Sequence, residues 1–374
     1  MMKKYLFIGC LSCVLLFFID KPAQSGIIPR PAKNIIENII KNGIDQINFI
    51  PYRTSMREMD FDTDKQIDIT ENKQQVQVAL RECRFGPIFV ASSCMDEGKF
   101  EIISGGEKIE LGYSCAGFKI HTPLSIGEFS CPSLQRFANG LLIDDNLRIF
   151  DDSEFKKVLI KYAEEDNEIA LMSLSEWKIH EGIPLVFDKL VTGKDKTFWL
   201  SELSRYKDVN NHVWINKIVP YLKSNDFNTV LRAADIFESW GQRQQLRDLM
   251  QSGEYVNLPL ISWLIHKRDK KTAQRAIPLL IVENCEITDA YILLEVPSKS
   301  SYMKLADIIE YHGDELYLNL VTDTTTSMGL EYDFVKKKLV PEGMRTVGGW
   351  SLNEVHIQSK IIAQSIRDWA ESKW

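Results

Sequence analysis

The sequence lacks the short motifs that mark common active sites. It contains no G-x-S-x-G, H-E-x-x-H, G-x-x-x-x-G-K-[ST] or G-x-G-x-x-G, so it offers no nucleophile elbow, zinc-protease helix, phosphate-binding loop or dinucleotide fingerprint. Its 6 histidines never lie three or four residues apart, so no two of them can bind a metal from one helix face. We therefore expect no cofactor and no metal, and we expect a binding protein rather than an enzyme.

The chain also lacks an excess of positive charge. It has 45 basic and 52 acidic residues, and removal of residues 1–25 takes away three lysines and one aspartate, leaving a net charge of −9. This charge disfavours a nucleic-acid partner, which needs a basic face to displace counterions, and it disfavours adhesion to an anionic membrane. No run of 18 apolar residues occurs after the N-terminal segment, so we expect no membrane insertion once that segment is cleaved.

Residues 1–25 have the layout of a secretory signal peptide. A short positive segment precedes an apolar run from Tyr5 to Ile19, and the small residues Ala23 and Ser25 occupy the −3 and −1 positions of a cleavage site. The run of 15 residues would span about 22 Å as a helix, less than the roughly 30 Å of a bilayer core. We expect cleavage after Ser25 and an extracytoplasmic protein, periplasmic or secreted. An uncleaved membrane anchor is the alternative.

The two halves of the chain differ in composition. All 8 tryptophans lie from Trp177 onward, whereas four of the five cysteines beyond the signal segment lie between Cys83 and Cys131. This difference predicts a domain boundary near residues 140–152. A helical-repeat domain is expected over residues 150–374.

The N-terminal half carries signals for one helix and several strands. Within residues 26–56, Pro31 and Gly43 bracket a short amphipathic pattern, which predicts a helical lead-in. Within residues 57–145, alternating stretches such as QVQVAL and FEIISGGEKIELGY predict an antiparallel β domain of four to six strands. The glycine pair in the second stretch is typical of a hairpin turn.

The cysteine cluster predicts disulfides. Cys83, Cys94, Cys115 and Cys131 are close in sequence, which favours disulfides in an oxidising compartment. The glycine-pair turn places Cys94 nearly opposite Cys115, so we favour Cys94–Cys115 with Cys83–Cys131 outside it. The other two connectivities stay open, and a zinc site is the rival, although no two of the four have C-x-x-C spacing. Cys285 is expected to be a buried free thiol.

A pattern recurs in the second half. The segment LKSNDFNTVLRAADIF, which contains Asp226, aligns with IHKRDKKTAQRAIPLL, which contains Asp269, and further segments carry Asp or Ser before a helical apolar pattern. Such residues cap a helix by accepting hydrogen bonds from its free backbone N–H groups. Each unit is therefore expected to be a helix, a capped tight turn and a second helix, and stacked units bury faces that one pair cannot. The anchors are Asp166, Asp195, Asp226, Asp269 and Ser298.

This pattern resembles that of HEAT-repeat proteins over roughly residues 153–310. In that family an Asp in the turn is often followed six residues later by Arg, as with Asp226 and Arg232 and with Asp269 and Arg275. The resemblance implies an α-solenoid with a curved protein-binding surface and no catalytic residues. An irregular helical bundle is the alternative, because the other three units lack the Arg and carry Met172, Ser201 and Lys304.

Two further features belong to the predicted repeat domain. Leu352 to Lys373 forms an imperfect amphipathic pattern, which predicts a terminal helix that caps the solenoid. Tryptophan is common at binding hot spots, although in helical repeats it is more often a core residue. The candidates for partner binding in the repeats are Trp199, Trp214, Trp240 and Trp263.

The sequence thus predicts an α+β protein, in which a small disulfide-bonded antiparallel β domain is followed by a HEAT-like α-solenoid. We expect an exported interaction or scaffold protein that binds a protein partner, whose identity the sequence leaves open, through its helical-repeat surface. The alternative is an extracytoplasmic hydrolase with a dispersed site between the two domains, because such a site leaves no motif.

The export prediction is tested by mass spectrometry of the protein from its producing cell. We expect the mature chain to begin at Gly26, because cleavage follows the small residue Ser25. A first residue of Met1, or a lipidated cysteine, would contradict the prediction.

Overall fold

The computed structural model describes residues 30–55, 58–85, 95–114, 117–120, 125–126, 128–207, 209, 212–312, 318–333, 336–344 and 352–374. Its contacts divide the chain into two compact units, the first ending at Gly182 and the second beginning at Ile183. The expected signal peptide and the expected Cys94–Cys115 pair lie outside the described residues.

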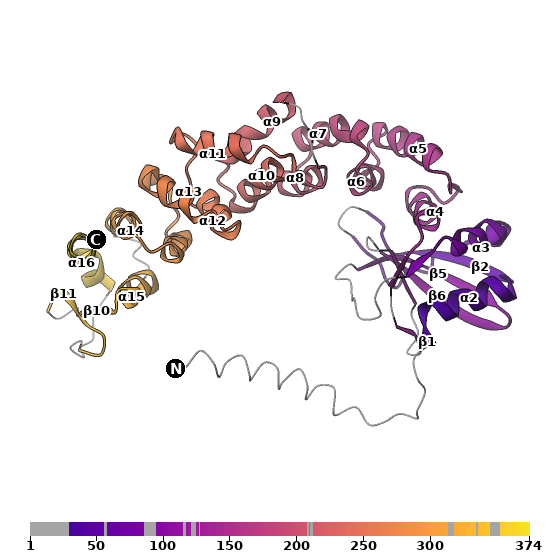
Figure 1. The fold of residues 1–374 in the computed structure, drawn as a ribbon, viewed down its shortest axis with the longest axis horizontal. Coiled ribbons are helices and arrows are strands. Elements are labelled where there is room, and N and C mark those ends of the chain that lie inside the picture. The colour runs from indigo at the N-terminus through magenta and orange to yellow at the C-terminus, as the bar shows by residue number, and fades with distance from the viewer. Residues whose placement is uncertain are drawn as a thin grey trace, which may run out of the picture. The chain divides into compact units, whose positions relative to one another are not determined.

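Unit 1 is built on an antiparallel sheet of seven strands in the order β3-β2-β5-β6-β7-β9-β4 (Figure 1). A separate pair joins β1 and β8 in parallel. The sheet has one strand more than the expected four to six, because β2 lies at residues 46–51, within the segment for which only a helical lead-in was expected. The strands are β1 (Arg30–Pro31), β2 (Gln46–Pro51), β3 (Ile67–Asp68), β4 (Arg84–Phe85), β5 (Asp96–Ser104), β6 (Glu107–Ser114), β7 (Gly117–Ile120), β8 (Ser125–Ile126) and β9 (Glu128–Ser130).

The β5–β6 hairpin forms where the glycine pair predicts it. Ser104 pairs with Glu107 across Gly105 and Gly106, whose φ angles are 56° and 82°. Positive φ at both central residues matches the right-handed twist of the flanking strands, and glycine adopts it without a side-chain clash. The alternation along β5 buries Phe100 and its like-facing neighbours in the core.

Three helices contribute to the same core as the sheet: α2 (Ala32–Asn42), α3 (Lys73–Arg81) and α4 (Pro132–Ile143). Helix α2 confirms the predicted lead-in helix, and it ends at Gly43, whose φ of 82° allows its N–H to bond the Ile39 carbonyl.

The strand expected at QVQVAL is wrong, because this stretch lies in α3. Val76, Ala79 and Leu80 are buried at helical spacing, whereas Val78 is 55% exposed. A short run with apolar residues at 76, 78, 79 and 80 satisfies both the strand period and the helix period. Burial of the 76/79/80 face against the sheet core decides for the helix.

A disulfide joins the helices α3 and α4. Cys83 follows α3, and Cys131 immediately precedes α4, so the Cys83–Cys131 bond connects segments 48 residues apart. This is one of the two expected pairings. Helices α5 (Asp152–Glu164) and α6 (Glu168–Glu176) complete unit 1, and α4 contacts both.

Unit 2 is a succession of short helices that follow one another in chain order (Figure 1). One row runs α8, α10, α12, η7 and α14, and each member contacts the next. The elements are α7 (Ile183–Thr192), α8 (Lys196–Ser204), α9 (His212–Ile218), η4 (Val219–Lys223), α10 (Phe227–Ser239), α11 (Arg243–Gln251), α12 (Leu258–His266), α13 (Lys270–Ala276), η5 (Ile277–Leu279), η6 (Val282–Asn284), η7 (Ile287–Glu295), α14 (Lys299–Tyr311), α15 (Leu318–Ser327), β10 (Leu330–Asp333), β11 (Lys338–Pro341) and α16 (Leu352–Lys373).

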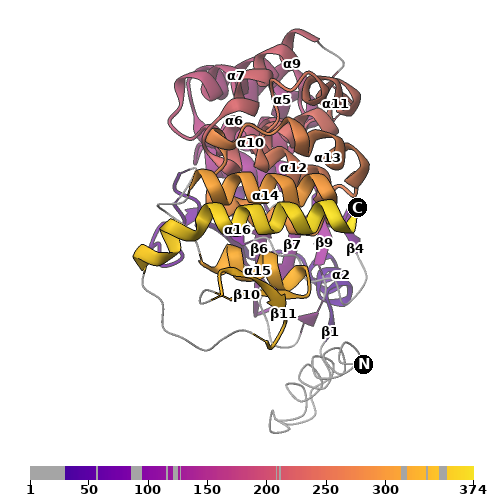
Figure 2. The ribbon, with the colours of Figure 1, turned by 90° about the vertical axis from the view of Figure 1, so that its left-hand side faces the viewer.

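The C-terminal helix α16 lies along α14, and the two run side by side in Figure 2. Ile362, Ala363, Ile366 and Ala370 are buried at helical spacing, which agrees with the amphipathic pattern of the sequence. No helix in the described part of the chain is both long enough and apolar enough to cross a membrane.

Loss of the disulfide should destabilise the protein. Replacing both Cys83 and Cys131 by alanine removes a constraint on the unfolded chain, and we expect a decrease of about 2–4 kcal/mol in the free energy of unfolding. Urea unfolding followed by circular dichroism measures the change. Cys285→Ala, which leaves the disulfide intact, is the control, and an unchanged urea midpoint for the double variant would count against this role.

Candidate functional site

Four of the five predicted anchor residues occupy the N-cap position of a helix. Each side-chain oxygen accepts a hydrogen bond of 2.7–3.3 Å from the backbone N–H three residues later. These bonds satisfy N–H groups that have no partner within the helix. The four are Asp195 at α8, Asp226 at α10, Asp269 at α13 and Ser298 at α14.

Asp166 lies one position before the cap of its helix. Asn167 caps α6 by accepting from the Ala170 N–H, at 3.0 Å. Asp166 itself has φ of 63° and ends the preceding helix in a left-handed conformation, which Asp tolerates better than most residues. The sequence motif therefore locates this turn correctly but shifts the cap by one residue.

Four turns between helices share a geometry that the sequence does not reveal, and two of them are anchor turns, at Asp166 and Asp269. In each, a residue with positive φ is followed by a residue whose N–H bonds the carbonyl five positions earlier. This pattern is a helix C-cap that reverses the chain within two residues. The four bonds are Asn167 to Tyr162, Ile179 to Leu174, Gln242 to Phe237 and Asp269 to Leu264.

The four candidate tryptophans are mostly core residues. Trp199, Trp240 and Trp263 are almost fully buried, so their rings offer no surface to a partner. Trp214 is half-buried; it stacks on Phe187 with centroids 4.7 Å apart and lies under the ammonium group of Lys217. Three of the four tryptophans therefore have the role of core residues, which is the commoner role of tryptophan in helical repeats.

Asp269 has partners beyond its cap hydrogen bond. Arg247 from α11 contacts its carboxylate at 2.6 Å, and Arg243 lies at 3.7 Å. Burial alone would raise the pKa of Asp269, but the hydrogen bonds from Arg247 and Thr272 outweigh burial and hold that pKa below its ordinary value. The charged form of Asp269 is therefore part of the folded structure.

A second ionic group surrounds the edge of Trp263. The indole N–H donates to Asp235 at 3.0 Å, and the cationic groups of Lys267 and Arg243 lie 5.6 and 5.7 Å from the ring. Lys267 also pairs with Glu238 at 2.5 Å. Together with Asp269, these contacts join α10, α11, α12 and α13.

Arg275 stands apart from both groups. It lies six residues after Asp269, yet the partner of Asp269 is Arg247, and Arg275 has no ion-pair partner among the described residues. Its counterpart Arg232 pairs with Asp235 at 3.4 Å. The two arginines marked by the repeat motif therefore differ: Arg232 has an acidic partner, whereas Arg275 has none among the described residues.

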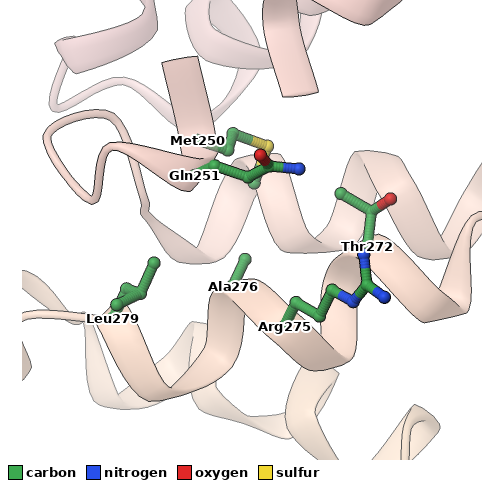
Figure 3. Close-up of a pocket in the computed structure, with 6 residues that line it drawn as sticks. All are labelled: Met250, Gln251, Thr272, Arg275, Ala276 and Leu279. Atoms are coloured by element: carbon green, nitrogen blue, oxygen red, sulfur yellow. The ribbon is translucent and has the colours of Figure 1, made fainter. Parts of the chain in front are cut away.

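Arg275 lines a pocket between α11 and α13. The pocket has a volume of about 170 Å³, and Figure 3 shows Met250 and Gln251 on one side, with Arg275 and Thr272 at one end of the opposite side. The remaining lining residues are Ala276 and Leu279. Neither a histidine, a carboxylate nor a thiol lines the pocket, so its lining has no general base that could activate the Thr272 hydroxyl.

The surface around the pocket is basic. Residues 243–276 contain seven basic and three acidic side chains, in a chain whose net charge is −7. Arg243, Arg247 and Lys267 are used by the ionic groups described above. The other four are exposed and have no ion-pair partner within the described part of the chain: Arg268, Lys270, Lys271 and Arg275.

Exposed apolar residues adjoin the same pocket. Leu279 is 41% exposed and Ile281 is 50% exposed, where the chain passes through the 3₁₀ helices η5 and η6. Cys285 follows them as a buried thiol whose Sγ donates to the Ile281 carbonyl, and burial raises its pKa to about 11. Cys285 is therefore a neutral, poorly reactive thiol at pH 7.

Metal chemistry finds no support in the described ranges, which contain no group of three or more His, Cys, Asp or Glu residues able to hold an ion. The residues brought together on this surface are instead cationic and apolar. We define the α11–α13 surface as Arg268, Lys270, Lys271, Arg275, Leu279 and Ile281 together with the pocket.

The role of Asp269 can be tested by pH-dependent unfolding. Asp269→Asn keeps a cap but loses the charge, and we expect a cost of about 1–2 kcal/mol at pH 7. The pKa of Asp269 is lower in the folded protein than in the unfolded chain. The charged carboxylate therefore stabilises the fold fully above the unfolded-state pKa, and this stabilisation is lost as pH falls through the folded-state pKa. The difference from wild type should therefore shrink below about pH 4. Asp248→Asn, an exposed site on α11, is the matched control, and a difference independent of pH would contradict this account.

Comparison with known proteins adds no relative to this description. No family model, no curated protein and no solved structure matches the chain. The resemblance to HEAT repeats therefore depends on the residues of the chain itself.

Proposed function

We propose that this chain is an exported interaction or scaffold protein, which binds a protein partner through the helical-repeat surface of unit 2. The observation that carries the proposal is the α11–α13 surface, where unpaired cations, exposed apolar residues and a small pocket adjoin one another. Such combinations of an apolar centre with a polar rim are typical of protein interfaces.

A HEAT-like α-solenoid is the fold that we propose for unit 2. Two observations support it: the members of the helix row contact their near neighbours in sequence, and the capped turn recurs. Helix α16 would be the terminal cap of this solenoid. Its Arg367 pairs with Asp307 and Glu310 on α14, at 2.7 and 2.6 Å.

Export is supported by the Cys83–Cys131 disulfide, because disulfides form and persist in oxidising compartments. The signal-like residues 1–25 agree with this localisation. The protein would therefore meet its partner in the periplasm or outside the cell.

Binding is preferred to catalysis on the chemistry of the pocket. A volume of about 170 Å³ is smaller than the roughly 300–1,000 Å³ of typical small-molecule sites. Its lining also supplies hydrogen-bond donors without any general base. A single side chain of a partner fits these dimensions better than a substrate does.

The proposal is tested by chemical cross-linking and pull-down from the native extracytoplasmic fraction at near-native concentration. We expect wild type to recover a specific partner, and a variant carrying Leu279→Asp and Ile281→Asp to lose most of it, because a buried apolar contact becomes charged. Val191→Asp on α7, an apolar site that is 66% exposed, is the control. Recovery of no partner by wild type would overturn the proposal.

A further inference from the structure

We propose that the α11–α13 surface binds an acidic segment of the partner, with one carboxylate of that segment in the pocket on Arg275 and an adjacent apolar residue on Leu279 and Ile281. This inference rests on the proposed function and specifies the chemistry of the partner.

Arg275 has the properties of a carboxylate receptor. Its guanidinium group carries five N–H donors in a planar fork, which matches the two oxygens of a carboxylate. It lines the pocket and has no acidic partner among the described residues. Gln251, on the facing helix α11, adds an amide donor to the opposite wall (Figure 3).

The neighbouring acids cannot neutralise Arg275, because they are already engaged. Asp269 accepts two hydrogen bonds from Arg247, at 2.6 and 2.9 Å, and it also caps α13. Asp248 accepts from Gln244, at 2.8 Å, on the outer side of α11. The positive charge of Arg275 therefore remains available to a ligand.

The surrounding charges extend this preference beyond one residue. Lys271 lies one helical turn before Arg275, and the exposed cations Lys270 and Arg268 lie at the first residue of α13 and in the turn before it. A basic surface repels the same surface on a second copy, and it favours an acidic segment of a partner. Recognition of acidic motifs by clusters of arginine is a recurring mode of peptide binding.

The apolar part of the surface selects a protein segment over other polyanions. Met250, Ala276 and Leu279 provide apolar walls, and the exposed Leu279 and Ile281 extend them outside the pocket. A peptide can place an acidic and an apolar side chain on neighbouring positions, whereas a nucleic acid repeats phosphates along its backbone.

The test uses the full-length protein and a short fluorescein-labelled peptide in which glutamate alternates with leucine. We expect saturable binding by fluorescence anisotropy, weakened by added salt because the contacts are charged. Arg275→Glu should weaken binding about tenfold or more, and Arg275→Gln should weaken it less, because the first substitution adds repulsion to the lost hydrogen bonds. Circular dichroism melting verifies that both variants fold.

The matched control is Lys360→Glu, an exposed cation on α16 that has no ion-pair partner among the described residues, and it should leave binding within about twofold of wild type. A lysine–leucine peptide, a single-stranded RNA and phosphatidylserine vesicles serve as competitors. The inference is overturned by equal binding of the lysine peptide, by stronger competition from RNA or vesicles, or by unchanged binding of Arg275→Glu.

The two proposals fail in distinguishable ways. If Arg275→Glu still captures the partner in the pull-down and binds the glutamate peptide as wild type does, the acidic-segment inference is wrong while the interaction function stands. If wild type captures no partner, the interaction function itself fails, whatever the peptide does.

Discussion

The hydrogen bond from an acidic or hydroxyl side chain to the backbone at the start of a helix is the interaction on which unit 2 depends. Its helices are short, and short helices are unstable unless their free N–H groups are satisfied and one face is buried. Asp226 and Asp269 satisfy these groups at turns that reverse the chain. Reversal then brings the apolar faces of successive helices together, so that α8, α10 and α12 form one row.

The same requirement explains why Arg275 is free. Asp269 must remain charged and in position to cap α13, and Arg247 supports it from the adjacent helix. With that carboxylate engaged, no acid among the described residues pairs with Arg275. The ion pair between Asp269 and Arg247 therefore both stabilises the turn before α13 and leaves the guanidinium group of Arg275 available to a ligand.

Much of the architecture is predictable from local patterns. The glycine pair predicts the hairpin, the capping residues predict the turns, and the amphipathic terminal pattern predicts α16. These three elements are predictable because each of them depends on residues that are close in sequence. QVQVAL is different, since its apolar spacing fits two periods and the choice depends on contacts with distant strands.

The proposed binding surface is less predictable for the same physical reason. The sequence shows one part of the difference between Arg232 and Arg275, because Asp235 lies three residues after Arg232 on the same helix, whereas Pro278 lies three residues after Arg275. Whether Arg275 meets an acid from another helix is the part that depends on which side chains the neighbouring helices bring within reach. Likewise, the tryptophans are conspicuous in the sequence but three of the four in the repeats are buried.

Helix α16 has a consequence for assembly. A row of helices that packs through near neighbours leaves an apolar face at its last member, and an identical face on another molecule could add to it without limit. Here α16 lies along α14 through Ile362, Ile366 and Ala370, and it turns Lys360 and Gln364 outward. In the proposed solenoid, this packing would cover the last apolar face of the row and so disfavour the addition of an identical face from another molecule.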